Sequence, residues 1–133
     1  MNHILVVEDD LSISHLITYN LAQAGHRVVT AFDGPEALHS VDSACPKLVT
    51  LDLLLPRQSG WEVLLAIRTH PRRQIATLPI IVLSALSSSH LRTDLRKSGV
   101  DHCLGKPFSV MELCVLVRSL LANRADAVWD NPL

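Results

Sequence analysis

Acidic side chains follow two short apolar segments of the chain, and their chemistry suits metal binding and phosphoryl transfer. Glu8 and Asp9 come directly after residues 4–7, and Asp52 ends a second apolar run. A carboxylate at the end of a buried segment is costly unless a cation, a charged partner or water meets it. Oxygen ligands in an open site favour Mg²⁺, which keeps several waters and takes one or two carboxylates. A carboxylate can also act as a nucleophile and form an aspartyl phosphate.

Two further polar side chains end apolar segments later in the chain. Ser84 follows residues 80–83, and Lys106 follows the short segment 102–104. A lysine ammonium is a point charge and a serine hydroxyl is a hydrogen-bond donor, so both suit the oxygens of a phosphoryl group. The transition state for phosphoryl transfer needs mainly positioning and charge neutralisation, which a metal ion and a lysine provide.

Short apolar runs and apolar residues at helical spacing predict the strands and helices that would position these side chains. Strands are expected near residues 4–7, 28–31, 48–51, 80–83 and 102–104, and helices near 11–24, 34–41, 61–69, 87–98 and 109–122. Residues 71–77 are expected to form a polar connection. Five alternations of strand and helix predict an α/β fold with a five-stranded parallel sheet and helices on both faces, for which the flavodoxin-like order 2-1-3-4-5 is one of two common arrangements. Ligands bind outside the carboxyl ends of such strands, where the polar side chains would meet.

Composition excludes several other classes of protein. A chain of 133 residues with a formal net charge of −1 has the length of one domain and no global field for nucleic acid or an anionic membrane. Three widely spaced cysteines argue against a disulfide framework or a zinc site and favour reduced thiols in a cytoplasmic protein. The first apolar run is too short for a signal peptide, and residues 75–91, which include Pro79, do not resemble a membrane span.

Four segments, in this order and spacing, resemble the receiver domain of bacterial two-component response regulators, of the kind found in chemotaxis regulators. They are residues 4–10 (ILVVEDD), 51–56 (LDLLLP) with Gly60, 83–85 (LSA) and 106–108 (KPF). The resemblance covers about residues 2–122, so a receiver domain is expected at 1–122 and a tail or linker at 123–133. It implies the sheet order 2-1-3-4-5 and a role in phosphorelay signalling.

The resemblance also implies a role for each polar position. Asp52 would be the phosphoacceptor, loaded by a sensor histidine kinase or a histidine phosphotransfer protein. The ligands of Mg²⁺ would be Glu8, Asp9, Asp52 and the backbone carbonyl of Leu54. The phosphoryl group would contact Ser84, the backbone of Ala85 and Lys106. Asp10, one place beyond the acidic pair, is expected to cap the following helix.

One position departs from the residue that the family usually carries, and two others are expected to affect the lifetime of the phosphoryl group. Cys103 stands where receivers usually carry the aromatic residue that swings inward on activation, so the signal would travel through helix shifts. We expect Cys103 to be a small buried residue, and a redox role would require a lowered pKa. Leu54 and Leu86 lie two residues after Asp52 and Ser84, and neither can orient an attacking water. Slow self-dephosphorylation is therefore predicted.

The expected last helix, 109–122, carries apolar residues on more than one face, which exceeds the single buried stripe that such a helix needs. One interpretation is a homodimer through the face formed by residues 87–98, 102–104 and 109–122. However, Leu116 and His102 replace an arginine and an acid that one branch of the family uses there. The other interpretation is that the tail, with Val128 and Trp129, folds back over the helix.

The function expected from these residues is a phosphorylation-controlled switch that catalyses only its own phosphorylation and dephosphorylation. A degenerate receiver that binds partners without phosphorylation is the first alternative. A phosphohydrolase with an aspartyl nucleophile is the second, but it would need an acid at position 54, where the chain has leucine. No glycine-rich nucleotide motif is present, and direct binding to nucleic acid or membrane is not expected.

Overall fold

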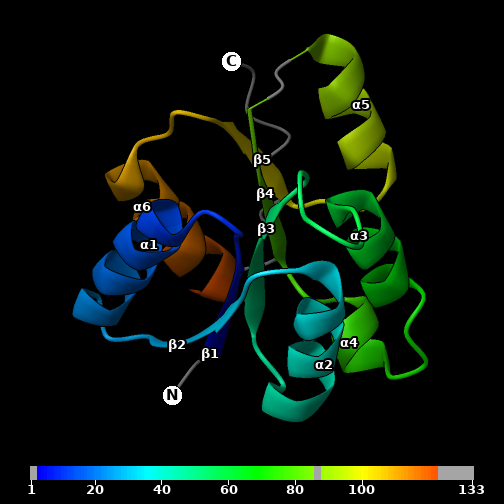
Figure 1. Cartoon of the computed structure of the whole chain (residues 1–133), viewed down its shortest axis with the longest axis horizontal. Helices are drawn as coiled ribbons and strands as arrows, with labels where there is room; N and C mark the ends of the chain where they lie inside the picture. Colours follow the sequence, from blue (N-terminus) through cyan, green and yellow to red (C-terminus); the bar gives the residue numbers. More distant parts are fainter. Residues whose placement is uncertain (1–2, 86–87, 123–133) are drawn as a thin grey trace.

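A parallel sheet forms the centre of the molecule (Figure 1). The computed structural model describes residues 3–85 and 88–122, so Leu86 and the tail with Val128 and Trp129 lie outside the described residues. The strands are β1 (His3–Val7), β2 (Arg27–Ala31), β3 (Leu48–Asp52), β4 (Ile80–Ser84) and β5 (His102–Gly105). Their order is β2-β1-β3-β4-β5, and every neighbouring pair is parallel. The predicted fold class and strand order are confirmed.

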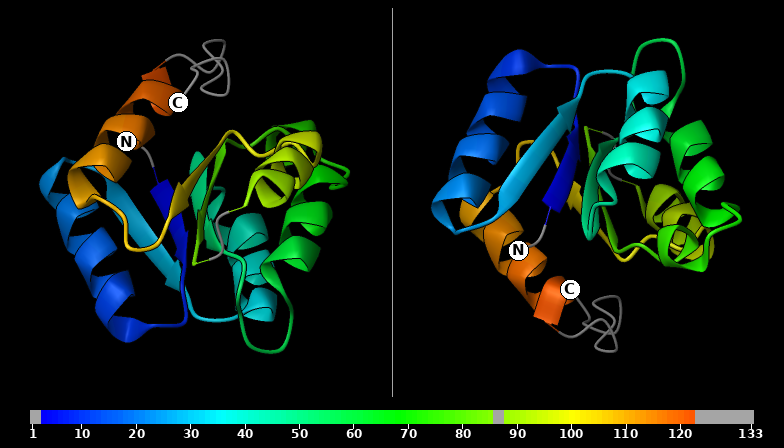
Figure 2. Two further views of the ribbon diagram at one scale, coloured as in Figure 1. Left: turned by 90° about the horizontal axis from the view of Figure 1, so that it is seen from above. Right: turned by 90° about the horizontal axis from the view of Figure 1, so that it is seen from below.

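Helices cover both faces of this sheet (Figure 2). They are α1 (Leu11–Gln23), α2 (Gly34–Ala44), α3 (Gly60–Arg68), α4 (Arg73–Ala76), α5 (Ser89–Lys97) and α6 (Val110–Ala122). Helices α1 and α6 pack on one face, and α2, α3, α4 and α5 pack on the other. Among the described residues, none of these helices combines the length and the apolarity that crossing a membrane requires.

The core lies on both sides of the strands because their apolar runs are nearly continuous. Leu5 and Val7 of β1 belong to the cluster with α2 and α3, whereas Ile4 and Val6 belong to the cluster with α1 and α6. All five residues of β3 are buried, as expected for a central strand of a covered parallel sheet. The acid at the end of β3 is therefore held by rigid, fully packed backbone.

Local capping residues define where the helices begin near the site. The Asp10 carboxylate accepts a hydrogen bond from the Ile13 amide at 3.0 Å, which confirms its expected role as the cap of α1. Ser59 and Glu62 form a reciprocal capping box at the start of α3.

The expectation of a polar connection at 71–77 is wrong in one respect, because residues Arg73–Ala76 form the one-turn helix α4. Its buried Ile75 packs in the core beneath it.

Candidate functional site

The carboxyl ends of the strands bring the predicted polar side chains to one edge of the sheet. Glu8 follows β1 directly, Asp52 ends β3 and Ser84 ends β4. Strand register places Asp52 opposite Leu83, one residue before Ser84, and places Ser84 opposite Gly105. Residues that are far apart in sequence are thus neighbours at this edge.

Three carboxylates converge at the mouth of β1 and β3. Glu8, Asp9 and Asp52 each offer one oxygen, and these oxygens all lie within 4.8 Å of one another. Glu8 and Asp52 are only 1% and 4% exposed, whereas Asp9 is open to solvent. An all-oxygen donor set with one side facing water matches the preference of Mg²⁺ for a few carboxylates and several waters. The residues present therefore fit a divalent cation of this kind.

Lys106 reaches into the same cluster from the loop after β5. Its Nζ lies 2.8 Å from Glu8 Oε1 and 3.1 Å from Asp52 Oδ2. The remaining oxygens also have donors, since the Asp10 amide donates to Glu8 Oε2 at 3.1 Å and the Leu54 amide donates to Asp52 Oδ1 at 3.0 Å. Both buried carboxylates are therefore held in fixed orientations, with the lysine ammonium between them.

Burial and neighbouring charges shift the pKa of both partners in this pair. Burial raises the pKa of the Glu8 carboxyl, and the charge of Asp52 adds to the rise, although Lys106 and the Asp10 amide oppose it. Burial alone would lower the pKa of Lys106, but the hydrogen bond to Glu8 and the charges of Asp52 and Glu8 outweigh it, so that this pKa is raised. Lys106 therefore remains a cation at neutral pH, and a bound metal ion would favour the ionised form of Glu8.

This shift predicts how stability changes with pH. The pKa of Glu8 is raised above the ordinary value of 4.5, so its contribution to metal-free stability is fully present below that value and is lost as the pH rises through the folded-state pKa. We expect Glu8→Gln, which cannot ionise, to gain stability relative to the native protein between pH 4.5 and neutrality, as measured by urea unfolding in EDTA. Excess Mg²⁺ at neutral pH should favour the native protein instead. A difference between the two proteins that is independent of pH would contradict the assignment.

Ser84 and Ala85 occupy the positions expected to meet a phosphoryl group. Ser84 is fully buried at the end of β4, and Ala85 beside it is exposed. The Lys106 amide donates to the Ser84 carbonyl at 2.7 Å, which connects the serine backbone directly to the lysine. A displacement of Ser84 would therefore also displace the segment that carries Lys106.

Cys103 is buried in the centre of β5. It belongs to the same apolar cluster as Leu95 and Val100, which flank the end of α5. Burial raises the pKa of the Cys103 thiol, so the thiol stays protonated. A raised pKa is the opposite of what a redox-sensing thiolate needs, and the geometry agrees with a small apolar filler.

Gly60 has a positional role that the sequence motif alone does not explain. Its amide donates to the Leu53 carbonyl at 2.9 Å, at the start of α3. A Cβ at this position would come within 2.4 Å of the Asp52 carbonyl oxygen and 2.5 Å of Leu53 Cα. Glycine therefore allows α3 to approach the backbone of the proposed phosphoacceptor.

Comparison with known proteins defines the class to which this fold and site belong. Residues 4–118 match the response regulator receiver domain, and the chain belongs to this family of two-component signalling proteins. It is similar to the receiver domain of the Francisella response regulator 1452, with 33% identity, a TM-score of 0.84 and coverage of 92% of this chain and 98% of that one.

Two further relatives have names that state an activity or the state of the protein in its structure. The DNA-binding dual master transcriptional regulator RpaA of Synechocystis is 37% identical over 96% of this chain and 52% of its own length. The BeF3-activated receiver domain of Klebsiella pneumoniae RstA is 26% identical, with a TM-score of 0.82 over 92% of this chain and 100% of that one. The chain thus spans about half the length of RpaA, and regulation of transcription is a property of that longer protein.

Proposed function

We propose that this chain is a phosphorylation-controlled switch in which Asp52 accepts a phosphoryl group from a histidine kinase or a histidine phosphotransfer protein. The observation that carries the proposal is the position of Lys106 Nζ, within hydrogen-bond distance of both Glu8 and Asp52, beside the acidic cluster. Structural ion pairs can also form such clusters. Here, however, Glu8, Asp52, Ser84 and Lys106 lie at one edge of the sheet, and the related RstA receiver is described as BeF3-activated, which supports the proposal.

The transfer step assigns a task to each side chain. An oxygen of Asp52 attacks phosphorus, the P–N bond to the donor imidazole breaks, and that nitrogen leaves with the bonding pair and takes up a proton. Mg²⁺, held by Glu8, Asp9, Asp52 and the Leu54 carbonyl, would neutralise charge on the phosphoryl oxygens. The Leu54 amide restrains the orientation of the Asp52 carboxylate. Lys106 then exchanges its contact with Asp52 for one with the phosphoryl group.

The structural effect of phosphorylation would be transmitted through β4 and β5. Ser84 would move toward the phosphoryl group, and its carbonyl accepts a hydrogen bond from the backbone amide of Lys106. Because Cys103 lacks the aromatic ring that would rotate on activation, the conformational change would reach the surface as a shift of α5 against β5. We infer that the α5–β5–α6 face is the output surface, within a receiver domain spanning residues 1–122 and followed by a tail at 123–133.

The direct test is exposure of the protein to acetyl phosphate or beryllofluoride in Mg²⁺. Intact mass should increase by one phosphoryl group with acetyl phosphate. Amide resonances of Ser84, Lys106 and α5 should shift with beryllofluoride, and both effects should vanish in EDTA. Size measurement before and after loading tests for a homodimer through the output surface. A protein that takes no phosphoryl group yet binds its partner would be a phosphorylation-independent interaction module.

Leu54 offers a separate test of phosphoryl-group lifetime. Its side chain is 59% exposed beside the site and cannot orient water, so decay of the phosphorylated protein should be slow. Leu54→Asn supplies a polar group there that can orient an attacking water, so it should speed decay. Leu65→Asn, at a 64% exposed position on α3, is the matched control. Equal decay rates for both variants would refute the role of position 54.

A further inference from the structure

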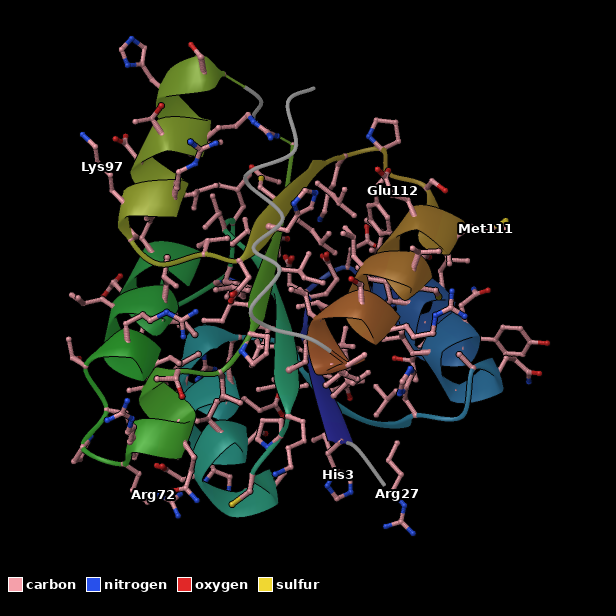
Figure 3. All side chains as sticks on the ribbon, turned by 180° about the vertical axis from the view of Figure 1, so that it is seen from behind. His3, Arg27, Arg72, Lys97, Met111 and Glu112 are labelled. Carbon is pink, nitrogen blue, oxygen red and sulfur yellow. The ribbon has the colours of Figure 1, made fainter. Side chains whose placement is uncertain are left out.

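A hollow between α1 and α6 lies outside the site described above. It has a volume of about 650 Å³ and is lined at one side by Asn20, Ala24 and His26 and at the other by Met111, Val115 and Arg118. Met111 and Val115 are 79% and 53% exposed, so large apolar side chains face solvent there. Figure 3 shows Met111 projecting outward from α6 on the side of α1. We call this hollow the α1–α6 groove.

The face of α6 that lines the groove continues to the last described residue of the helix. Met111, Val115, Arg118 and Ala122 are spaced by four, three and four residues, which places them on the same face of a helix. Ala122 is the last residue of α6 among the described residues, and the tail follows it in the sequence. The apolar, positively charged stripe therefore leads from the groove to the origin of the tail.

The tail sequence has the chemistry that this groove lacks. Residues 126–130 are Asp-Ala-Val-Trp-Asp, in which two large apolar side chains are flanked by two acids. Val128 and Trp129 would cover the exposed methionine and valine, and an aspartate would meet Arg118. A second copy of the chain that met this groove with its own groove would be a poorer match, because the described lining contains no acid to pair with Arg118.

The length of the tail is sufficient for this contact. Val115 lies seven residues before Ala122, a distance of about 10 Å along a helix at 1.5 Å per residue. Trp129 lies seven residues after Ala122, a segment that spans up to about 23 Å when extended. Asn123, at the start of the tail, is a residue type that favours helix ends where the chain reverses.

We propose that residues 126–130 fold back along α6 and dock Val128 and Trp129 in the α1–α6 groove, with Asp126 paired to Arg118. Docking buries the apolar stripe of α6 within the same molecule. The proposal does not depend on phosphorylation, since neither the groove nor the tail contributes to the acidic site.

Trp129 reports docking directly once the other tryptophan is removed. In a full-length Trp61→Phe background, Trp129 is the only tryptophan. Docking should give blue-shifted emission and weak quenching by acrylamide, both independent of protein concentration. Val115→Asp, at an exposed position of the groove, should restore red-shifted emission and strong quenching. Leu65→Asp, on α3 at the opposite face of the sheet, should leave the fluorescence of Trp129 unchanged.

The other outcomes overturn the proposal in distinguishable ways. Fully exposed Trp129 in the Trp61→Phe protein would show that the groove does not hold the tail. Dimer formation can be measured by sedimentation at increasing protein concentration. If Trp129 became protected from acrylamide only as the dimer formed, the groove would be assigned to a second copy. Protection that survives Val115→Asp would place Trp129 elsewhere.

A charge exchange tests the proposed ion pair. Arg118→Glu should reduce the ratio of docked to free tail about two- to fivefold, the range expected of an exposed pair. Asp126→Arg in the same protein should recover most of that loss, because the pair is restored with opposite polarity. Absence of recovery would remove Asp126 from the contact.

Discussion

Asp52→Asn is expected to abolish uptake of a phosphoryl group from acetyl phosphate in Mg²⁺. The amide keeps the size of the carboxylate but is not a nucleophile for phosphorus, so intact mass should show no adduct at a time when the native protein is extensively loaded. The variant should fold, because the amide oxygen can still accept the hydrogen bond from the Leu54 amide, and Lys106 keeps its hydrogen bond to Glu8.

The matched control is Asp42→Asn, the same chemical change at an exposed carboxylate that contacts His70 and Arg72 on the far side of the molecule. It should be loaded at the native rate. Phosphoryl uptake by Asp52→Asn equal to that of this control would remove Asp52 as the acceptor and, with it, the proposed function. Retained partner binding by an unloaded native protein would instead indicate a degenerate receiver.

Gly60→Ala is expected to reduce the free energy of unfolding by about 1–3 kcal/mol, the cost typical of an overpacked site. In an ordinary helix the same change would be favourable by about 1 kcal/mol. Here the new Cβ would collide with the Asp52 carbonyl oxygen and with Leu53 Cα, and both are backbone atoms that cannot rotate away. Relief requires α3 or the loop after β3 to move, so the rate of phosphoryl uptake should also fall.

Gly25→Ala is the control for this prediction. Gly25 has a φ of +96°, yet a Cβ there would meet no described atom within 4 Å. Its cost should be about 1 kcal/mol from backbone conformation alone, with phosphoryl uptake unchanged. Urea unfolding and intact mass separate the two effects. A Gly60→Ala protein as stable as the native one would show that α3 does not pack closely on the β3 end.

The apolar patterns determined the sheet and the edge at which its polar residues lie. Residues 48–51 are apolar or small throughout, as a strand covered on both faces requires, and parallel strands necessarily end together. For this reason the acids after β1 and β3 could be assigned to one site from the order of the residues alone. The short helix α4 could not be predicted, because one turn is too short for a helical period to appear in the sequence.

Contacts between distant segments depended on the tertiary structure alone. Glu8 and Lys106 are 98 residues apart, and only the packing of five strands in the order β2-β1-β3-β4-β5 brings their charged atoms to 2.8 Å. The directions of the pKa shifts follow from burial, which no local pattern specifies. The close approach at Gly60 and the groove between α1 and α6 likewise arise from how helices rest on the sheet, because local sequence sets the faces of elements but not the distances between them.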